Sequence, residues 1–242
     1  MTNQAGPAGK TNGRTALSGQ AEDGRVDSMG KKMVKDRCVV LGAAPVRDYG
    51  KIAALLTRRD YLICADGGLV HAGRLGLEPD LVVGDFDSYR GERSYRCDTV
   101  QVPSEKDESD TLLAVRLAAD RGYRRILLLG GTGGRMDHTI SNLQTLVYGL
   151  EQGLEVSLAD EDNLAFVLRD ESRQVKARPG WMLSVFCYGD RAEGVNLSGV
   201  KYPVDNGVLT NAFPLGLSNE FRGEFAGISV KKGTLLVVLS RA

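Results

Sequence analysis

Residues 37–170 alternate between short apolar runs and segments with apolar residues on one helical face. The runs are uninterrupted, as in strands that are buried on both faces. They predict strands over residues 38–42, 61–65, 81–83 and 125–129, and the segment 154–158 predicts a fifth strand. The amphipathic segments predict helices over residues 49–58, 69–75, 110–121 and 139–150. Strands that alternate with helices indicate a mostly parallel sheet, so we expect an α/β domain over residues 37–170.

The pattern changes after residue 170. Turn signals recur every 6 to 12 residues from residue 175 onward, with short apolar stretches between them. This spacing is typical of antiparallel strands and predicts a smaller β domain over residues 175–242. The interval 170–180, which contains Pro179-Gly180, is the expected linker. Trp181, the only tryptophan, opens the following strand and is expected to pack in a core.

Composition narrows the possible classes of function. Residues 1–36 are mostly small and polar, which predicts a disordered extension. Lys plus Arg and Asp plus Glu both number 31, so a basic nucleic-acid-binding surface is not expected. No apolar run reaches the length of a membrane span. The four cysteines form no C-x-x-C pair and fit small buried residues of a reducing compartment, so we expect a cytoplasmic protein.

Acidic residues gather where predicted strands end. Asp85 and Asp87 flank Phe86 after the third strand, and alternate residues of an extended segment point the same way. Both carboxylates can therefore face one Mg²⁺, although a polar turn explains such a pair equally well when it stands alone. Asp107 and Asp110 share one face at the start of a helix. Asp107 fits a helix cap or a ligand, and Asp110 is the better candidate for catalysis or metal binding.

Glycine-rich turns follow the second and fourth strands. Gly130 to Gly134 precede Arg135, Asp137 and His138, and glycines in such a turn let backbone N–H groups approach phosphate. A tight turn is the alternative, but an adjacent guanidinium favours a polyphosphate clamp. Asp137 could hold a metal ion or orient the arginine.

Three further groups of residues are ambiguous. Asp66-Gly67-Gly68 leaves room for a nucleotide, or forms a simple turn. Lys106 is a phosphate contact or a solvated lysine. Ser218-Asn219 offers donors and acceptors to a heterocycle, or forms a hairpin turn. We interpret His71 as structural and assign neither histidine to a metal.

Five blocks taken together resemble the thiamine pyrophosphokinase family. They are Ala65-Asp66-Gly67-Gly68, Pro79 to Ser88, Lys106 to Asp110, Gly131 to His138 and Gly216 to Glu220. Each block is weak alone, and their order and spacing are specific. Ser109 stands where the family usually has threonine, which keeps the hydroxyl group. The resemblance implies a Rossmann-like α/β/α catalytic sandwich followed by an antiparallel β-sandwich that binds thiamine.

The resemblance also implies an activity and a set of roles. The activity is Mg²⁺-dependent transfer of a pyrophosphoryl group from ATP to the hydroxyl of thiamine, with release of AMP. Members are usually homodimers that bind thiamine between subunits. In some members a tryptophan shortly after the Ser-Asn pair stacks on thiamine, whereas this chain has Phe221 and Phe225 in that stretch. By analogy the metal would be held by Asp85, Asp87 and Asp110, with Asp107 and Asp137 in support. ATP would be bound by Asp66, Gly67, Gly68, Lys106, Gly131, Gly133, Gly134 and Arg135, and thiamine by Ser218 and Asn219.

Two other functions are alternatives to this one. A pyrophosphokinase for a hydroxymethylpterin would use the same chemistry on a different acceptor. A non-catalytic nucleotide sensor would be favoured by loss of a metal carboxylate, yet Asp85, Asp87 and Asp110 are all present.

Overall fold

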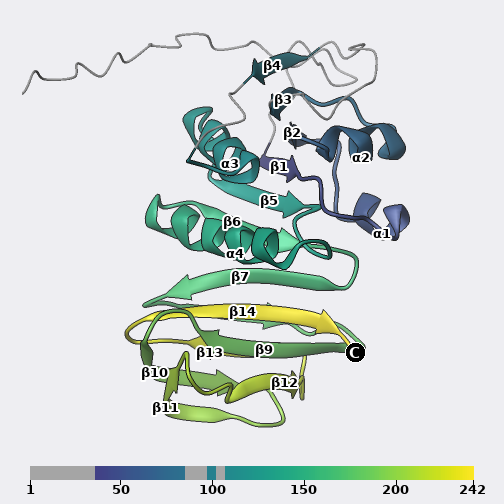
Figure 1. The fold of residues 1–242 in the computed structure, drawn as a ribbon. Helices are drawn as coiled ribbons and strands as arrows, with labels where there is room; N and C mark the ends of the chain where they lie inside the picture. The colour runs from purple at the N-terminus through teal and green to yellow at the C-terminus, as the bar shows by residue number, and fades with distance from the viewer. Residues whose placement is uncertain (1–35, 85–96, 102–106) are drawn as a thin grey trace, which may run out of the picture. The chain divides into compact units, whose positions relative to one another are not determined.

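A ten-stranded mixed sheet runs the length of the described structure (Figure 1). The computed structural model describes residues 36–84, 97–101 and 107–242, which belong to one unit. The strand order is β12-β9-β14-β7-β6-β5-β1-β2-β3-β4. Six neighbouring strands are parallel: β1 (Arg37–Leu41), β2 (Asp60–Ala65), β3 (Leu81–Gly84), β4 (Asp98–Gln101), β5 (Arg125–Leu129) and β6 (Glu155–Ala159). Four are antiparallel: β7 (Asn163–Arg169), β14 (Thr234–Arg241), β9 (Trp181–Cys187) and β12 (Gly216–Glu220).

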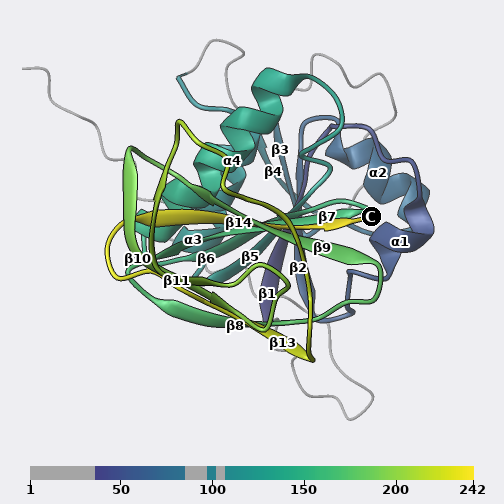
Figure 2. The same ribbon diagram turned by 90° about the horizontal axis from the view of Figure 1, so that it is seen from below.

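Helices cover both faces of the parallel strands, as continuous apolar runs require. One face carries Val40, Ile63 and Leu128 and packs against α3 (Asp110–Asp120) and α4 (Met136–Glu151). The opposite face carries Val39 and Leu62 and packs against α1 (Tyr49–Ala53) and α2 (Gly68–Leu75). Seen from below, α1 and α2 lie on one side of the sheet and α4 on the other (Figure 2).

The antiparallel strands form a sandwich with a second sheet. Its four strands, in the order β11-β10-β13-β8, are β11 (Val204–Thr210), β10 (Arg191–Ser198), β13 (Phe225–Ser229) and β8 (Ser172–Lys176). Leu183, Val185 and Val237 of the large sheet pack in one core with Val195 and Ile228 of the small sheet. The predicted fold class, an α/β sandwich followed by an antiparallel β-sandwich, is therefore confirmed.

Several details differ from the sequence-based expectation, and they include strand β7 (Asn163–Arg169), where no strand was predicted. The interval 170–180 is not a free linker, because β8 occupies Ser172–Lys176 and pairs with β13. Strand β4 was not expected, since Asp-Thr-Val-Gln carries a single apolar residue at the edge of the sheet. Helix α1 ends at Ala53 and not at residue 58. Within the described ranges, no helix is long and apolar enough to span a membrane. The expected extension over residues 1–36 lies outside these ranges except for Asp36.

Candidate active site

The order in which the chain adds parallel strands to the sheet reverses between β1 and β5. From β1 the chain adds β2, β3 and β4 on one side, then returns through α3 to place β5 and β6 on the other. Ligands of open α/β sheets bind at the carboxyl ends of the strands at such a point. Gly42 and Gly130 follow the two strands and lie against each other. A Cβ on Gly42 would approach the Gly130 carbonyl oxygen to 2.7 Å, so only glycine fits this contact.

A cleft of about 640 Å³ opens at this point. Its walls come from the ends of β1, β2 and β5 and from the N-terminal turns of α3 and α4. Residues lining the cleft are Ala43, Ala44, Pro45, Ala65, Asp66, Glu108, Ser109, Asp110, Thr111, Gly130, Gly131, Gly134, Arg135, Asp137, His138, Ser141 and Asn142.

One wall of the cleft is acidic. Asp66 follows β2 in a left-handed conformation (φ 48°), and Asp110 begins α3 directly after the N-cap Ser109. Ser109 Oγ accepts a 3.2 Å hydrogen bond from the Leu112 N–H, which fixes the start of this helix. Glu108 pairs with Arg116 through one oxygen, whereas its buried Oε2 has no hydrogen-bond partner in the described structure.

These oxygens suit a hard divalent cation, since Mg²⁺ is bound through carboxylates and phosphate. A buried carboxylate oxygen without a partner is costly unless a ligand or ion completes it. The described residues contain no group of three metal-ligating side chains. Asp85, Asp87 and Lys106, which were predicted to complete this wall, lie outside the described residues.

The glycine-rich turn and Arg135 form the opposite wall. Gly130 and Gly133 have φ of 61° and 80°, a region that disfavours other residues. Arg135 occupies the N-cap position of α4 and pairs with Asp137 through two hydrogen bonds, one of 3.1 Å from Nε. The hydrogen bond from Arg135 holds the pKa of the Asp137 carboxyl below its ordinary value, and Asp137 raises the pKa of Arg135. Both side chains are exposed, so the charges face the cleft and solvent.

Acidic residues after β6 hold the loops that border the cleft. Thr132 Oγ1 donates a 2.6 Å hydrogen bond to Asp160, which also accepts from the Asn163 side chain. Glu161 is 6% exposed and accepts the backbone N–H groups of Arg47 and Asp48. Both neighbouring loops are therefore fixed from one turn.

His71 has the structural role expected of it. It is 7% exposed, and its Nε2 lies 3.0 Å from the Ala44 carbonyl oxygen. Its Nδ1 lies 2.7 Å from the Tyr49 hydroxyl. The histidine thus holds the loop after β1, which lines the cleft. Cysteines 38, 64 and 187 are buried, and burial raises the pKa of the Cys64 thiol, as expected of unreactive core residues.

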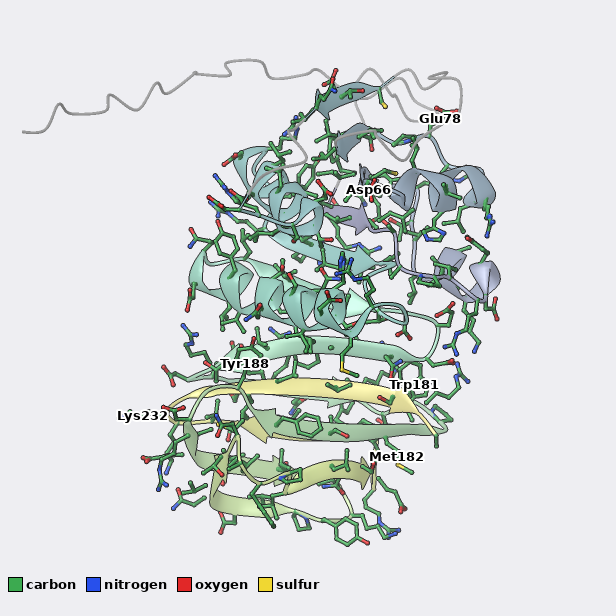
Figure 3. All side chains as sticks on the ribbon, viewed as in Figure 1. Asp66, Glu78, Trp181, Met182, Tyr188 and Lys232 are labelled. Carbon is green, nitrogen blue, oxygen red and sulfur yellow. The ribbon has the colours of Figure 1, made fainter. Side chains whose placement is uncertain are left out.

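Ser218 and Asn219 lie away from the cleft, on β12 at the edge of the large sheet. Asn219 is 4% exposed, and its side-chain amide bonds the Tyr202 backbone twice: Oδ1 accepts the N–H at 2.9 Å and Nδ2 donates to the carbonyl at 2.7 Å. Tyr202 itself is 62% exposed. Figure 3 shows Asp66 among the α/β elements and, away from it, Met182 of β9, which pairs with Glu220 of β12.

The cleft thus gathers most of the predicted site residues that the structure describes. Those lining it are Asp66, Asp110, Gly131, Gly134, Arg135 and Asp137. Gly133 lines a neighbouring cavity. Gly67 precedes α2, and Gly68 begins that helix against the β1 backbone, where a Cβ would come within 1.8 Å of the Leu41 oxygen. Gly68 therefore serves close packing.

Sequence reasoning overlooked several residues around the cleft. The segment Ala43-Ala44-Pro45 follows β1 and was detectable by the strand-end rule that selected Asp66. Glu108 stood inside a recognised block without a role of its own. Thr132 also stood inside a recognised block, and its contact with Asp160 had no sequence signal because it joins residues far apart in the chain. Asn219 was named as a candidate for thiamine binding, but its contact with Tyr202 was not predicted.

The fold defines a class of protein: an α/β protein with a cleft at the carboxyl ends of its parallel strands and an appended β-sandwich. Comparison with known proteins identifies the family. Residues 52–158 match the model of the thiamin pyrophosphokinase catalytic domain, and residues 172–235 match that of the thiamin pyrophosphokinase vitamin B1 binding domain. Together these matches cover more than half of the chain. The chain therefore belongs to the thiamin pyrophosphokinase family, whose transferases make thiamine diphosphate from ATP and thiamine.

Individual relatives agree with this assignment. The thiamine pyrophosphokinase of Bacillus subtilis (strain 168) is 28% identical over 191 residues, which cover 74% of this chain and 86% of the relative. Thiamin pyrophosphokinase 1 of Caenorhabditis elegans is 24% identical over 76% of this chain and 80% of the relative. The solved structure of the Enterococcus faecalis family protein superposes with a TM-score of 0.73 at 28% identity, covering 85% of this chain and 99% of that one. The Bacillus subtilis structure gives 0.78 at 24% identity, covering 85% and 99%, which supports the fold.

Proposed function

We propose that the cleft binds ATP with Mg²⁺ and transfers its terminal pyrophosphoryl group to the hydroxyl of thiamine. This proposal rests on one observation: the cleft has an acidic wall and a wall of glycines and Arg135, and it lies where the strand order reverses. A triphosphate carries too much negative charge for carboxylates alone, so an acidic wall is useful only with a bound cation. Asp110, Asp85 and Asp87 would hold Mg²⁺, which offsets charge on the phosphate oxygens, with Glu108 nearby. Asp137 would support them.

The chain's own residues would act mainly by positioning. Transfer requires the thiamine hydroxyl oxygen to attack the β-phosphorus while the bond to the α-phosphate oxygen breaks and AMP leaves. Arg135 would donate to equatorial phosphate oxygens, and the N–H groups of Gly131 to Gly134 would face the same charge. A carboxylate of the acidic wall would accept the hydroxyl proton.

Thiamine would bind at the exposed surface beside β12. Ser218 and Tyr202 are candidates for direct contact, because the Asn219 amide is already bound to the Tyr202 backbone. Tyr202 presents an exposed ring suited to stacking on an aromatic heterocycle, whereas Phe221 packs against the sandwich core. We retain residues 37–170 as the ATP-binding part and 175–242 as the thiamine-binding part within this proposal. Three of the four cysteines are buried in the core, which fits a reducing compartment and supports the proposed cytoplasmic location.

The two substrate regions of one chain are far apart. Six inter-strand spacings separate β12 from β1 in the large sheet, which is about 29 Å at ~4.8 Å each. Direct transfer needs the reacting atoms within ~3.5 Å. We therefore propose a homodimer in which the β12 surface of one chain completes the cleft of its partner.

An exposed apolar surface supports this dimer. Phe213, Leu215 and Leu217 are 66%, 55% and 59% exposed and adjoin or belong to edge strand β12. At the cleft, Met136 and Ile140 of α4 are 77% and 52% exposed. Two exposed apolar patches on one chain, each beside one half of the proposed site, are what a second copy would cover.

The first experiment is a product analysis with ATP, Mg²⁺ and thiamine. Thiamine diphosphate formed in step with AMP, and stopped by EDTA, is the expected result. Thiamine monophosphate with ADP would contradict pyrophosphoryl transfer. Hydroxymethylpterin serves as the competing acceptor, and turnover of that substrate alone would reassign the enzyme.

A complementation experiment tests the shared site. Asp110→Asn chains and Tyr202→Ala chains are mixed, unfolded and refolded together, and assayed at low thiamine concentration. A mixed dimer contains one site with both residues intact, so activity should exceed that of either variant alone. Activity no higher than the sum of the separate variants would place both residues in one chain's site.

A further inference from the structure

His71 connects both helices of the α1–α2 face to the loop that follows β1. It belongs to α2, is 7% exposed and is not among the described residues that line the cleft. Its Nε2 lies 3.0 Å from the Ala44 carbonyl oxygen. Its Nδ1 lies 2.7 Å from the hydroxyl of Tyr49, the first residue of α1. Both ring nitrogens are therefore bonded to groups outside α2.

The chemistry of these partners decides which ring nitrogen carries the proton. A carbonyl oxygen can only accept, so Nε2 donates to Ala44. The neutral ring then accepts through Nδ1, and the Tyr49 hydroxyl donates to it. That hydroxyl accepts a 3.1 Å hydrogen bond from Nη1 of Arg74, in the last turn of α2. The four residues thus form a chain of hydrogen bonds in which every donor points toward the loop.

Ala44 is the place where this chain of hydrogen bonds reaches the cleft. It lines the cleft, and its N–H donates a 2.8 Å hydrogen bond to the carbonyl oxygen of Gly130, at the start of the glycine-rich turn. Its own carbonyl oxygen is the acceptor for His71. Because both backbone groups of Ala44 are bonded, the loop after β1 is tied to the glycine-rich turn on one side and to α2 on the other.

The direction of the Ala44 carbonyl is important for an anionic ligand. A carbonyl oxygen carries partial negative charge, so it would repel a polyphosphate if it faced into the cleft. The hydrogen bond from the buried His71 holds this oxygen toward α2 instead. The same bond steadies the glycine-rich turn through Ala44, and backbone N–H groups of such a turn are suited to phosphate.

We infer that His71 is a positioning residue for ATP, which acts through the Ala44 backbone to hold the two loops in the arrangement that accepts the triphosphate. The inference rests on the proposed function, because it takes the cleft to be the triphosphate site. His71 does not touch the nucleotide in this arrangement. Its substitution should therefore change the affinity for ATP and leave turnover at saturating ATP almost unchanged.

Two substitutions of His71 test the inference. His71→Phe keeps a flat ring but lacks the donor to Ala44, whereas His71→Gln places an amide donor close to the position of Nε2. Calorimetry with Mg²⁺ and ATP should show about five- to tenfold weaker binding for His71→Phe, as expected for one lost hydrogen bond, and near-normal binding for His71→Gln. Val70→Ala, at the neighbouring exposed position of α2, is the matched control and should bind ATP normally.

Kinetics separate positioning from a general loss of structure. For His71→Phe, the KM for ATP should rise with the dissociation constant, while kcat and the KM for thiamine stay within about twofold. Unchanged ATP affinity in folded His71→Phe would overturn the inference, as would a His71→Gln variant that is equally impaired. Wild-type protein whose ATP binding depends on His71 but which forms no thiamine diphosphate would contradict the proposed function alone.

The tautomer of His71 gives a test that needs no substitution. The chain has two histidines, so long-range proton–nitrogen NMR spectra of the whole protein are simple to assign, with His138 as the second signal. We expect His71 to carry its proton on Nε2, with Nδ1 unprotonated. A ring without a proton on Nε2 would overturn the inference, because it could not donate to the Ala44 carbonyl.

Discussion

The parallel and antiparallel halves of the ten-stranded sheet use polar residues in opposite ways. In the parallel half, Asp66, Asp110 and Arg135 stand at element ends and line a cleft. In the antiparallel half, the amide of Asn219 is buried and satisfies the backbone of its own chain. The first half therefore presents charge to an open cleft, and the second uses a polar group to hold the backbone of an exposed tyrosine. A conspicuous polar motif can accordingly be a contact in one half and a support in the other.

Removing charge from the acidic wall should give the largest effect. Asp110→Asn should lower kcat by about 10³-fold or more, because metal-assisted charge neutralisation would be lost. Asp120→Asn, at the far end of the same helix, is the control and should keep full activity. The measurement is AMP release together with circular dichroism, and a folded Asp110→Asn enzyme with normal turnover would remove this residue from the site.

On the wall formed by the glycine-rich turn and Arg135, we expect a substitution to change the KM for ATP. Arg135→Ala should raise the KM for ATP by about 10- to 100-fold, since a charged donor to phosphate is removed. The KM for thiamine should change little. Arg124→Ala, another exposed arginine, provides the comparison. The measurement is steady-state kinetics with each substrate varied in turn. If the KM for ATP of Arg135→Ala is unchanged, Arg135 only holds Asp137 and does not contact ATP.

In the antiparallel half, we expect a substitution of the buried amide to change the free energy of unfolding. Asn219→Ala leaves the Tyr202 N–H and carbonyl without their partner, which should lower the free energy of unfolding by about 1–3 kcal/mol. Asn211→Ala, at an exposed position before β12, should have almost no effect. Urea unfolding measures both variants. Equal stability of the two would mean that the Asn219 amide is available to a ligand after all.

Tyr202 should affect thiamine and not ATP. Tyr202→Ala should raise the KM for thiamine about five- to tenfold, in line with the value of an aromatic contact, and Tyr202→Phe should restore it. Kinetics at saturating ATP separate this effect from a loss of stability. If Tyr202→Phe is as impaired as Tyr202→Ala, the hydroxyl and not the ring makes the contact.

The smallest expected effect concerns the pH dependence of the Arg135–Asp137 pair. Asp137 has a lowered pKa in the folded chain, so its pairing favours folding above the unfolded value near 3.9. That contribution is lost as the pH falls through the lower folded value. Arg135→Ala should move the pKa of Asp137 upward. Carbon-detected NMR titration measures the pKa of the Asp137 carboxyl in both proteins. An equal pKa would mean that the hydrogen bond from the His138 N–H, and not Arg135, lowers it.

Much of the parallel half could be predicted from local sequence. Continuous apolar runs marked β1, β2, β3 and β5, and alternating apolar residues marked β6. The rule that ligands bind at strand ends led to Asp66, Asp110 and Arg135. The edge strand β4 was missed because one apolar residue gives no pattern. Strand β8 was taken for a linker since its neighbour, β13, lies fifty residues later and supplies the pairing. Contacts between distant residues, such as Thr132 with Asp160, leave no local trace.

Strand β14 has a consequence for how the chain is made. It lies between β7 and β9, and these two strands are joined in the large sheet only through it. Residues 234–241 follow every other strand in the sequence, so they leave the ribosome after the rest of the sheet. The parallel half can fold earlier during synthesis, whereas β9 and β12 can join the large sheet only after β14 has been made. Until then the edges of β7 and β9 are open to pairing with other chains, which makes this interval the period of greatest aggregation risk.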